Sequence, residues 1–241
     1  MEQPTVVYED NHVIVVVKRP NQLVQADATG DSDLLSEVKE YIRVKYEKPG
    51  EAWVGLVHRM DRPVGGLLCF ARTSKAAARL SEQVRSHEMR REYVCVVRGE
   101  TPDDFTLRDW LKKDEKNNRV TVLPEYLKMQ GKEAVLHGHT VESRNGLSLC
   151  AIHLETGRAH QIRTQMEHFG HPLWGDNRYG DGKPGQQIAL WGMRLSFTHP
   201  TTGKKMVFIA PAPRTGGFAG FTTQLDTLEN LWPAIREGQI E

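Results

Sequence analysis

The chain has 241 residues, of which 39% are hydrophobic and 26% charged, and its formal net charge is +1. This is the composition of an ordinary globular protein with one sizeable α/β domain or two small ones, and it excludes a disordered or collagen-like chain. The longest aliphatic run, residues 13–17, is too short to cross a bilayer, and the N-terminus does not resemble a secretory signal. We therefore expect a cytoplasmic protein.

The first fifty residues predict a hairpin followed by a helix. Two β-branched runs, residues 5–8 and 12–17, are separated by Glu9, Asp10 and Asn11, and Asp and Asn favour turns. Between residues 32 and 48 apolar side chains recur at helical spacing, and Pro49 and Gly50 follow. We expect this amphipathic helix to pack on a sheet.

Residues 56–74, LVHRMDRPVGGLLCFARTS, predict a strand, a tight polar loop and a second, buried strand. The loop places Asp61 between Arg59 and Arg62, and Pro63 stiffens it while the glycines at 65 and 66 allow a sharp bend. A carboxylate held rigidly at a strand edge can act as a nucleophile, a base or an orienting anion. Considered alone, a surface aspartate in a salt-bridged turn is the more common structure.

A second helix is predicted from Ser74, which we expect to be its N-cap, with Ala77, Leu80 and Val84 on one face. Cations gather in two groups, at Arg72, Lys75, Arg79, Arg85, Arg90 and Arg91, and at Lys112, Lys113, Lys116 and Arg119. Each group is either a solvated surface or a surface that follows phosphates.

The middle of the chain continues the sheet. Residues 91–97 are apolar on both faces, as in a central strand, and Tyr93 within them is by itself more typical of a core than of a catalytic site. The polar residues 103–127 predict an extended loop or β-arm. Asn145 and Gly146 then predict a hairpin turn between strands at 136–141 and 147–154.

Residues 154–180, LETGRAHQIRTQMEHFGHPLWGDNRYG, predict a short helix with Ile162 and Met166 on its apolar stripe and Gly170 at its end. His160 and Arg163 then lie near the helix start. A last hairpin is predicted within residues 188–211, and the tail from 214 carries a possible apolar stripe at Leu228, Leu231, Trp232 and Ile235. We expect this tail to pack back on the domain, although a partner-binding segment is an alternative.

Neither a metal nor a nucleotide cofactor is expected. The cysteines Cys69, Cys95 and Cys150 are odd in number and lie in apolar runs, as free buried thiols do. The histidines lack cysteine partners at ligand spacing, and they are His137, His139, His160, His168 and His171. The glycine-containing runs lack the context of a phosphate-binding loop.

Two segments carry a resemblance to a known family. HRMDRPVGGLLCFART resembles the HRLD-x-x-[ST]-G-L-L-[LV]-F-A-[KR]-T motif of the RluA-type pseudouridine synthases, and LETGRAHQIR with GHPLWGDNRYG resembles their other main motif. The resemblance extends over residues 5–211. It implies an α/β (α+β) fold with a mixed, mostly antiparallel central sheet, flanking helices and an RNA-binding cleft. We expect a catalytic domain at 1–213, a tail at 214–241 and no N-terminal domain of the ribosomal S4 type.

The resemblance also implies roles for single residues. Asp61 is the expected catalytic carboxylate, as nucleophile or as base; Tyr93 lies against the uracil, and Arg163 pairs with Asp61. The target base must leave its helix. Arg59 is expected to fill the gap and His58 to set the loop. The expected RNA-binding residues are His58, Arg59, Arg62, Arg72, Lys75, Arg158 and His160.

The resemblance implies a cofactor-free enzyme that acts on transfer or ribosomal RNA, and we expect it to be a monomer. The alternative is a catalytically silent RNA-binding protein or an RNA chaperone. Such a protein need not retain Asp61, Tyr93 and Arg163 together, so their joint presence favours the enzyme. One departure from the motif is that Val64 and Gly65 stand where the family usually has a hydroxyl side chain.

Overall fold

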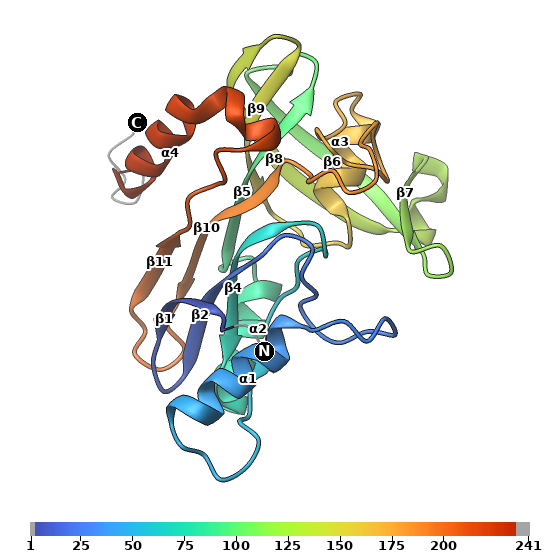
Figure 1. Cartoon of the computed structure of the whole chain (residues 1–241). Coiled ribbons are helices and arrows are strands. Elements are labelled where there is room, and N and C mark those ends of the chain that lie inside the picture. The colour runs from blue at the N-terminus through green and yellow to red at the C-terminus, as the bar shows by residue number, and fades with distance from the viewer. Residues whose placement is uncertain (1–2, 235–241) are drawn as a thin grey trace. The chain divides into compact units, whose positions relative to one another are not determined.

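The computed structural model describes residues 3–234, with side chains to residue 230, and the chain divides into two compact units (Figure 1). The first unit comprises Met1–Arg91 and Arg194–Ala210, and the second comprises Glu92–Met193 and Pro211–Glu241. The boundaries fall inside two strands, β5 (Arg90–Arg98) and β10 (Leu190–Thr198). Within the described residues no helix is long and apolar enough to span a membrane.

In the first unit, β1 (Thr5–Glu9), β2 (Val13–Lys18) and β4 (Gly65–Ala71) lie in that order and pair antiparallel. The two-residue strand β3 (Gly55–Leu56) also pairs with β4. The predicted N-terminal hairpin is therefore confirmed. Every residue of β4 is buried, which explains why its sequence, GGLLCFA, shows no polar alternation.

Two helices complete this unit. In α1 (Leu34–Lys45) the apolar side chains pack on those of β2 and β4, and the Asp33 side chain caps the helix by accepting the Ser36 N–H. The second helix, α2 (Ser74–Arg85), is confirmed, but the predicted N-cap is wrong by one residue. Thr73 is extended and its hydroxyl accepts the Ala76 N–H, so Ser74 is the first helical residue.

The buried face of α2 consists of Ala76, Leu80 and Gln83. The Gln83 amide bonds to both the N–H and the carbonyl of Thr198, where β10 and β11 (Lys205–Ile209) form the predicted closing hairpin. A polar side chain on the inner face therefore attaches this hairpin to the helix.

In the second unit the strand order is β5, β9 (Leu147–Leu154), β8 (Lys132–Arg144), β6 (Asp104–Asp114) and β7 (Arg119–Leu123), again antiparallel. The predicted turn between β8 and β9 is confirmed, with positive φ at Asn145 and Gly146. The predicted arm is the β6–β7 hairpin, labelled at β7 in Figure 1. A 3₁₀ helix, η1 (Glu125–Gln130), follows it. The expected α/β fold with a mostly antiparallel central sheet is thus confirmed.

The helix α3 (Gln161–His168) belongs to the second unit, and its end is the one predicted. Gly170 has φ +89°, its N–H bonds to Glu167 O and the His171 N–H bonds to Met166 O, which is a Schellman motif. The three cysteines are free and buried, as predicted.

The tail contains η2 (Gly216–Phe221) and α4 (Thr222–Ala234). Phe218, Phe221 and Leu225 are buried, and Arg214 forms ion pairs with Asp226 and Glu229. Of the predicted stripe only Leu228 has a described side chain, because Leu231, Trp232 and Ile235 lie outside the described side chains. The division into 1–213 and 214–241 stays a prediction.

Candidate active site

Asp61 opens a tight turn that leads directly into β4. The Val64 N–H donates to the Asp61 carbonyl oxygen at 3.0 Å, which closes a turn across Arg62 and Pro63. Gly66, with φ +127°, is the position in this stretch whose backbone requires glycine. The Asp61 side chain is half-buried. The carboxylate is therefore presented at the start of a buried strand, as the sequence predicts.

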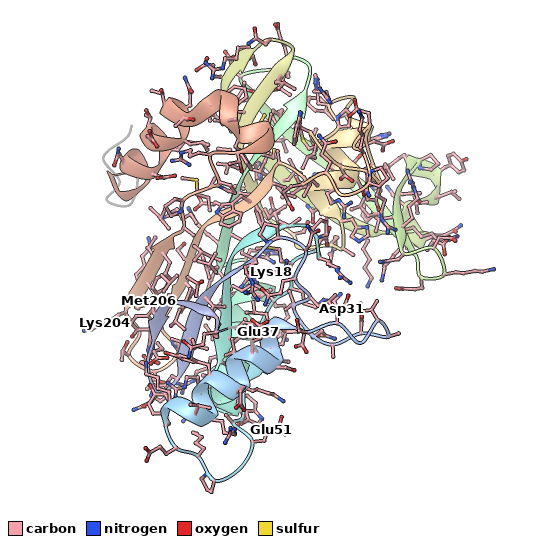
Figure 2. The ribbon with its side chains drawn as sticks, viewed as in Figure 1. Lys18, Asp31, Glu37, Glu51, Lys204 and Met206 are labelled. Carbon is pink, nitrogen blue, oxygen red and sulfur yellow. The ribbon has the colours of Figure 1, made fainter. Side chains whose placement is uncertain are left out.

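Lys18, at the end of β2 and labelled in Figure 2, holds this turn through its side chain. Its ammonium group donates to the carbonyl oxygens of Arg19 at 3.0 Å, Arg62 at 2.9 Å and Val64 at 2.6 Å. The three N–H donors of the ammonium group thus each meet a carbonyl acceptor, and Lys18 is fully buried, with 0% exposure. Sequence analysis missed Lys18 as a site residue, although a lysine closing an otherwise aliphatic strand was the available signal.

The charge on Lys18 interacts with the charged groups of the loop that carries Asp61. Burial lowers the pKa of Lys18 to about 7; the nearby Asp61 carboxylate opposes this shift, and Arg62 adds to it. A buried cation therefore lies close enough to Asp61 for the two charges to attract one another.

His58 anchors the other end of the loop. The strand β3 ends at Leu56, which pairs with Phe70, and the His58 Nε2 accepts the N–H of Cys69 at 3.2 Å. Beyond the end of β3, the imidazole thus takes the place of a strand carbonyl as the acceptor for the Cys69 N–H. Because Nε2 accepts this bond, the proton of the neutral ring lies on Nδ1. Burial, with a smaller contribution from Arg91, lowers the pKa of His58 to about 3. The ring is neutral at physiological pH, which suits the role of setting the loop.

We expect His58→Gln to reduce the amount by which the free energy of unfolding falls when the solution is acidified. The unfolded chain protonates this histidine below its ordinary pKa of 6.5, whereas the folded chain does so only near 3. The unfolded state therefore binds more protons in this window, and the free energy of unfolding decreases as the pH falls. Between pH 7 and 4.5 the wild type should lose about 2–3 kcal/mol more than the variant, at about 1.4 kcal/mol per pH unit. Urea unfolding at both pH values measures this difference. His168→Gln, at an exposed histidine, is the control, and an equal loss in all three proteins would contradict the argument.

The predicted RNA-binding cations of this unit divide into two kinds. Arg59 and Lys75 are exposed. Arg62 forms an ion pair with Asp31 and donates to the Asn21 carbonyl, while Arg72 stacks on Tyr46 and donates to the Asp10 carbonyl. Arg62 and Arg72 therefore also serve contacts within the unit.

In the second unit, Arg163 is held by a partner that the sequence analysis did not name. Its guanidinium is 4% exposed and donates twice to Asp176, from Nε at 2.7 Å and from Nη2 at 2.8 Å. Such a bidentate pair fixes the plane of the guanidinium. The predicted pairing of Arg163 with Asp61 joins residues of different units and stays a prediction.

Asp176 lies in a loop built around glycines. Burial raises the pKa of its carboxyl, but hydrogen bonds from Arg163 and from the backbone N–H groups of Arg178 and Tyr179 outweigh this effect, and the pKa is below its ordinary value. A Cβ at Gly175 would lie 2.5 Å from the Gln187 carbonyl oxygen. The GDNRYG run is therefore a compact cradle for this carboxylate, and its Asp was the signal available in the sequence.

The remaining predicted residues lie around the start of α3 and on β5. His160 is the N-cap residue, with φ +51°, and its Nδ1 lies 2.7 Å from the Tyr179 hydroxyl. The Arg158 side chain donates to the Glu133 carbonyl oxygen. Tyr93 is 7% exposed on β5, opposite Ile152 of β9. Within residues 3–234 no group of three His, Cys, Asp or Glu side chains is placed to hold a metal ion.

Asp61 and Arg163 both lie within the part of the chain that one family model matches. The family model described as RNA pseudouridylate synthase matches residues 12–168, and the chain belongs to this family. It is 34% identical over 227 residues to the ribosomal large subunit pseudouridine synthase D of Neisseria meningitidis serogroup A / serotype 4A, covering 86% of this chain and 58% of that protein. It is 35% identical to the uncharacterized RNA pseudouridine synthase YlyB of Bacillus subtilis, over 86% of this chain and 68% of the relative.

Solved structures agree with the fold. Human RNA Pseudouridylate Synthase Domain Containing 4 superposes with a TM-score of 0.72 at 16% sequence identity, covering 92% of this chain and 93% of that one. Human RNA Pseudouridylate Synthase Domain Containing 1 gives a TM-score of 0.70 at 19% identity. The chain spans 58% of the length of the Neisseria relative, less than two thirds of it.

Proposed function

We propose that this chain converts uridine in structured RNA to pseudouridine. The bond between uracil N1 and ribose C1′ breaks, the base rotates, and a bond forms between C5 and C1′. The C5 hydrogen leaves to solvent and N1 gains a proton, so the atoms balance without a cofactor or a metal. The observation that carries the proposal is the rigid presentation of Asp61, whose turn is held through two of its carbonyls by Lys18.

In the proposed reaction Asp61 acts on the ribose, either by attacking C1′ or by removing a proton. Tyr93 stacks on the uracil, and Arg163 orients the Asp61 carboxylate. The buried pair with Asp176 supports this role, because it fixes the guanidinium before RNA binds. Preorganised charge of this kind is usually the largest single contribution to enzymatic rate enhancement.

The target uridine must be flipped out of its helix, at a cost of roughly a few kcal/mol. The exposed Arg59 is the candidate to fill the gap. Phosphate contacts offset the cost, and we assign them to Arg62, Arg72, Lys75, Arg158 and His160 together with Arg59. Because His58 is buried, its part is indirect, through the shape of the loop.

The names of several relatives refer to the large ribosomal subunit, which favours ribosomal RNA over transfer RNA as the substrate. We propose that the enzyme acts as a monomer in the cytoplasm, where both RNAs are found.

Tritium release from RNA labelled at uracil C5 tests the activity and the substrate class together. Unmodified large-subunit ribosomal RNA and unmodified bulk transfer RNA are incubated separately with the protein. We expect release from the ribosomal RNA. Release from transfer RNA alone would reverse the substrate assignment. RNA binding without release from either would favour the silent RNA-binding protein.

A further inference from the structure

Tyr179 lies where three parts of the second unit meet: the β6–β7 arm, the start of α3 and the Asp176 loop. Its side chain is buried, with 3% exposure. The hydroxyl accepts the Val120 N–H of β7 at 2.7 Å and lies 2.7 Å from His160 Nδ1. Its ring lies 5.0 Å from the Arg119 guanidinium and 5.1 Å from that of Arg163. One side chain thus contacts the arm, the N-cap of α3 and the proposed catalytic arginine.

The hydrogen bonds of Tyr179 favour one tautomer of His160. A backbone N–H can only donate, so the tyrosine oxygen accepts from Val120, and the hydroxyl proton then needs an acceptor of its own. His160 Nδ1 is at hydrogen-bonding distance and provides it. The proton of the neutral imidazole is therefore on Nε2, and His160 presents that N–H as a donor. His160 makes no side-chain capping bond to α3, so its side chain serves this contact rather than the helix end.

The arm itself is locked to the same loop. The Arg178 guanidinium donates to the carbonyl oxygens of Asn117 at 3.1 Å and Asn118 at 2.6 Å, at the tip of the β6–β7 hairpin. In return Arg119 donates to the Arg178 carbonyl at 2.8 Å. The arm carries the second basic group, which ends at Arg119. The ring of Tyr179 thus contacts both Arg119, the last cation of this group, and Arg163.

We propose that Tyr179 is a positioning residue that couples RNA bound on the β6–β7 arm to Arg163 and His160. This inference rests on the proposed pseudouridine synthase activity. Both guanidinium groups lie within the distance at which an aromatic ring attracts a cation, so the ring constrains Arg119 and Arg163 together. The Tyr179 hydroxyl also orients the His160 ring, and a phenylalanine at this position could not do so.

The test compares Tyr179→Phe with Tyr126→Phe, the same change at a tyrosine of the same unit that is 83% exposed. Single-turnover tritium release and RNA affinity are measured for each folded variant. Tyr179→Phe keeps the ring and loses the hydroxyl, so we expect the single-turnover rate to fall about 10-fold or more and the Kd to change less than about 3-fold. Tyr126→Phe should match the wild type in both. A purely structural role would lower thermal stability and leave the rate per folded molecule unchanged, which would overturn the proposal.

A second variant distinguishes coupling through His160 from an effect on folding. His160→Gln leaves the Val120–Tyr179 bond in place and should lower the rate to the same extent. The double variant should be no slower than either single one, because both changes remove one interaction. Multiplying effects would overturn coupling through His160, and His160→Gln alone decides the matter if Tyr179→Phe does not fold. Failure of the proposed function is a different result, since the wild type itself would then release no tritium.

Discussion

Asp61→Asn should abolish tritium release, lowering the rate by about 10⁴-fold or more, which is the effect of removing a group that carries out the chemical step. Asparagine has nearly the shape of aspartate, and the substitution keeps the Asp61 carbonyl oxygen that accepts the Val64 N–H in the turn. The loop should therefore keep its structure while it loses the negative charge and the nucleophilic or basic oxygen. Single-turnover kinetics measure the loss, and circular dichroism and RNA binding verify the fold.

Asp31→Asn is the matched control, because it makes the same chemical change in the same unit. Its carboxylate pairs with Arg62, and both side chains are about half exposed, so the pair should contribute little. We expect activity within about 3-fold of the wild type, the change that removal of a weak surface ion pair allows. If Asp61→Asn retained a tenth of the wild-type rate, Asp61 would not be the catalytic carboxylate, and the functional assignment would have to be revised.

Lys18→Met should leave a folded protein that is slower by about 10²-fold or more, the effect of small displacements of a reacting group. Methionine fills a similar volume but donates no hydrogen bond, so the carbonyl oxygens of Arg62 and Val64 lose their donor. The turn that presents Asp61 then loses its fixed position. Lys39→Met is the control, since this lysine pairs with Glu51 at the surface. A rate equal to that of Lys39→Met would show that the turn needs no buried ammonium group.

The stability of the same variant should depend on pH in a defined direction. The pKa of Lys18 falls from its ordinary value of 10.5 to about 7 on folding. Between these values the unfolded chain binds more protons than the folded one, so the free energy of unfolding rises with pH on this account. From pH 7 to 9 the wild type should gain about 2–3 kcal/mol relative to Lys18→Met, at about 1.4 kcal/mol per unit. Urea unfolding measures this gain, and a constant difference across these pH values would contradict it.

Those parts of the fold that depend on neighbouring residues could be predicted from the sequence. The turn at Asn145 and Gly146 and the end of α3 at Gly170 follow from local backbone preferences. The cap of α2 was misplaced because Thr73 and Ser74 are both good caps, and only the backbone geometry distinguishes them. Periodicity and turn chemistry thus locate elements well and their first residues less well.

The contacts that hold the candidate site could not be predicted in this way, because they join distant segments. Lys18 reaches carbonyls 44 and 46 positions away, and Tyr179 reaches Val120 across 59 positions. No residue pattern within one element encodes such a pair. The family motifs drew attention to Asp61 and Arg163, whereas Lys18, Asp176 and Tyr179 became visible as partners only in three dimensions.

The way in which Lys18 holds the Asp61 turn has a consequence for sequence variation. The ammonium group recognises main-chain oxygen atoms, which every amino acid carries. The side chains at positions 64 and 65 therefore take no part in the hydrogen bonds of Lys18. Having Val64 and Gly65 in place of a hydroxyl side chain removes none of these bonds. Natural variation at these two buried positions therefore leaves the hydrogen bonds of the turn intact, so long as Lys18 is retained.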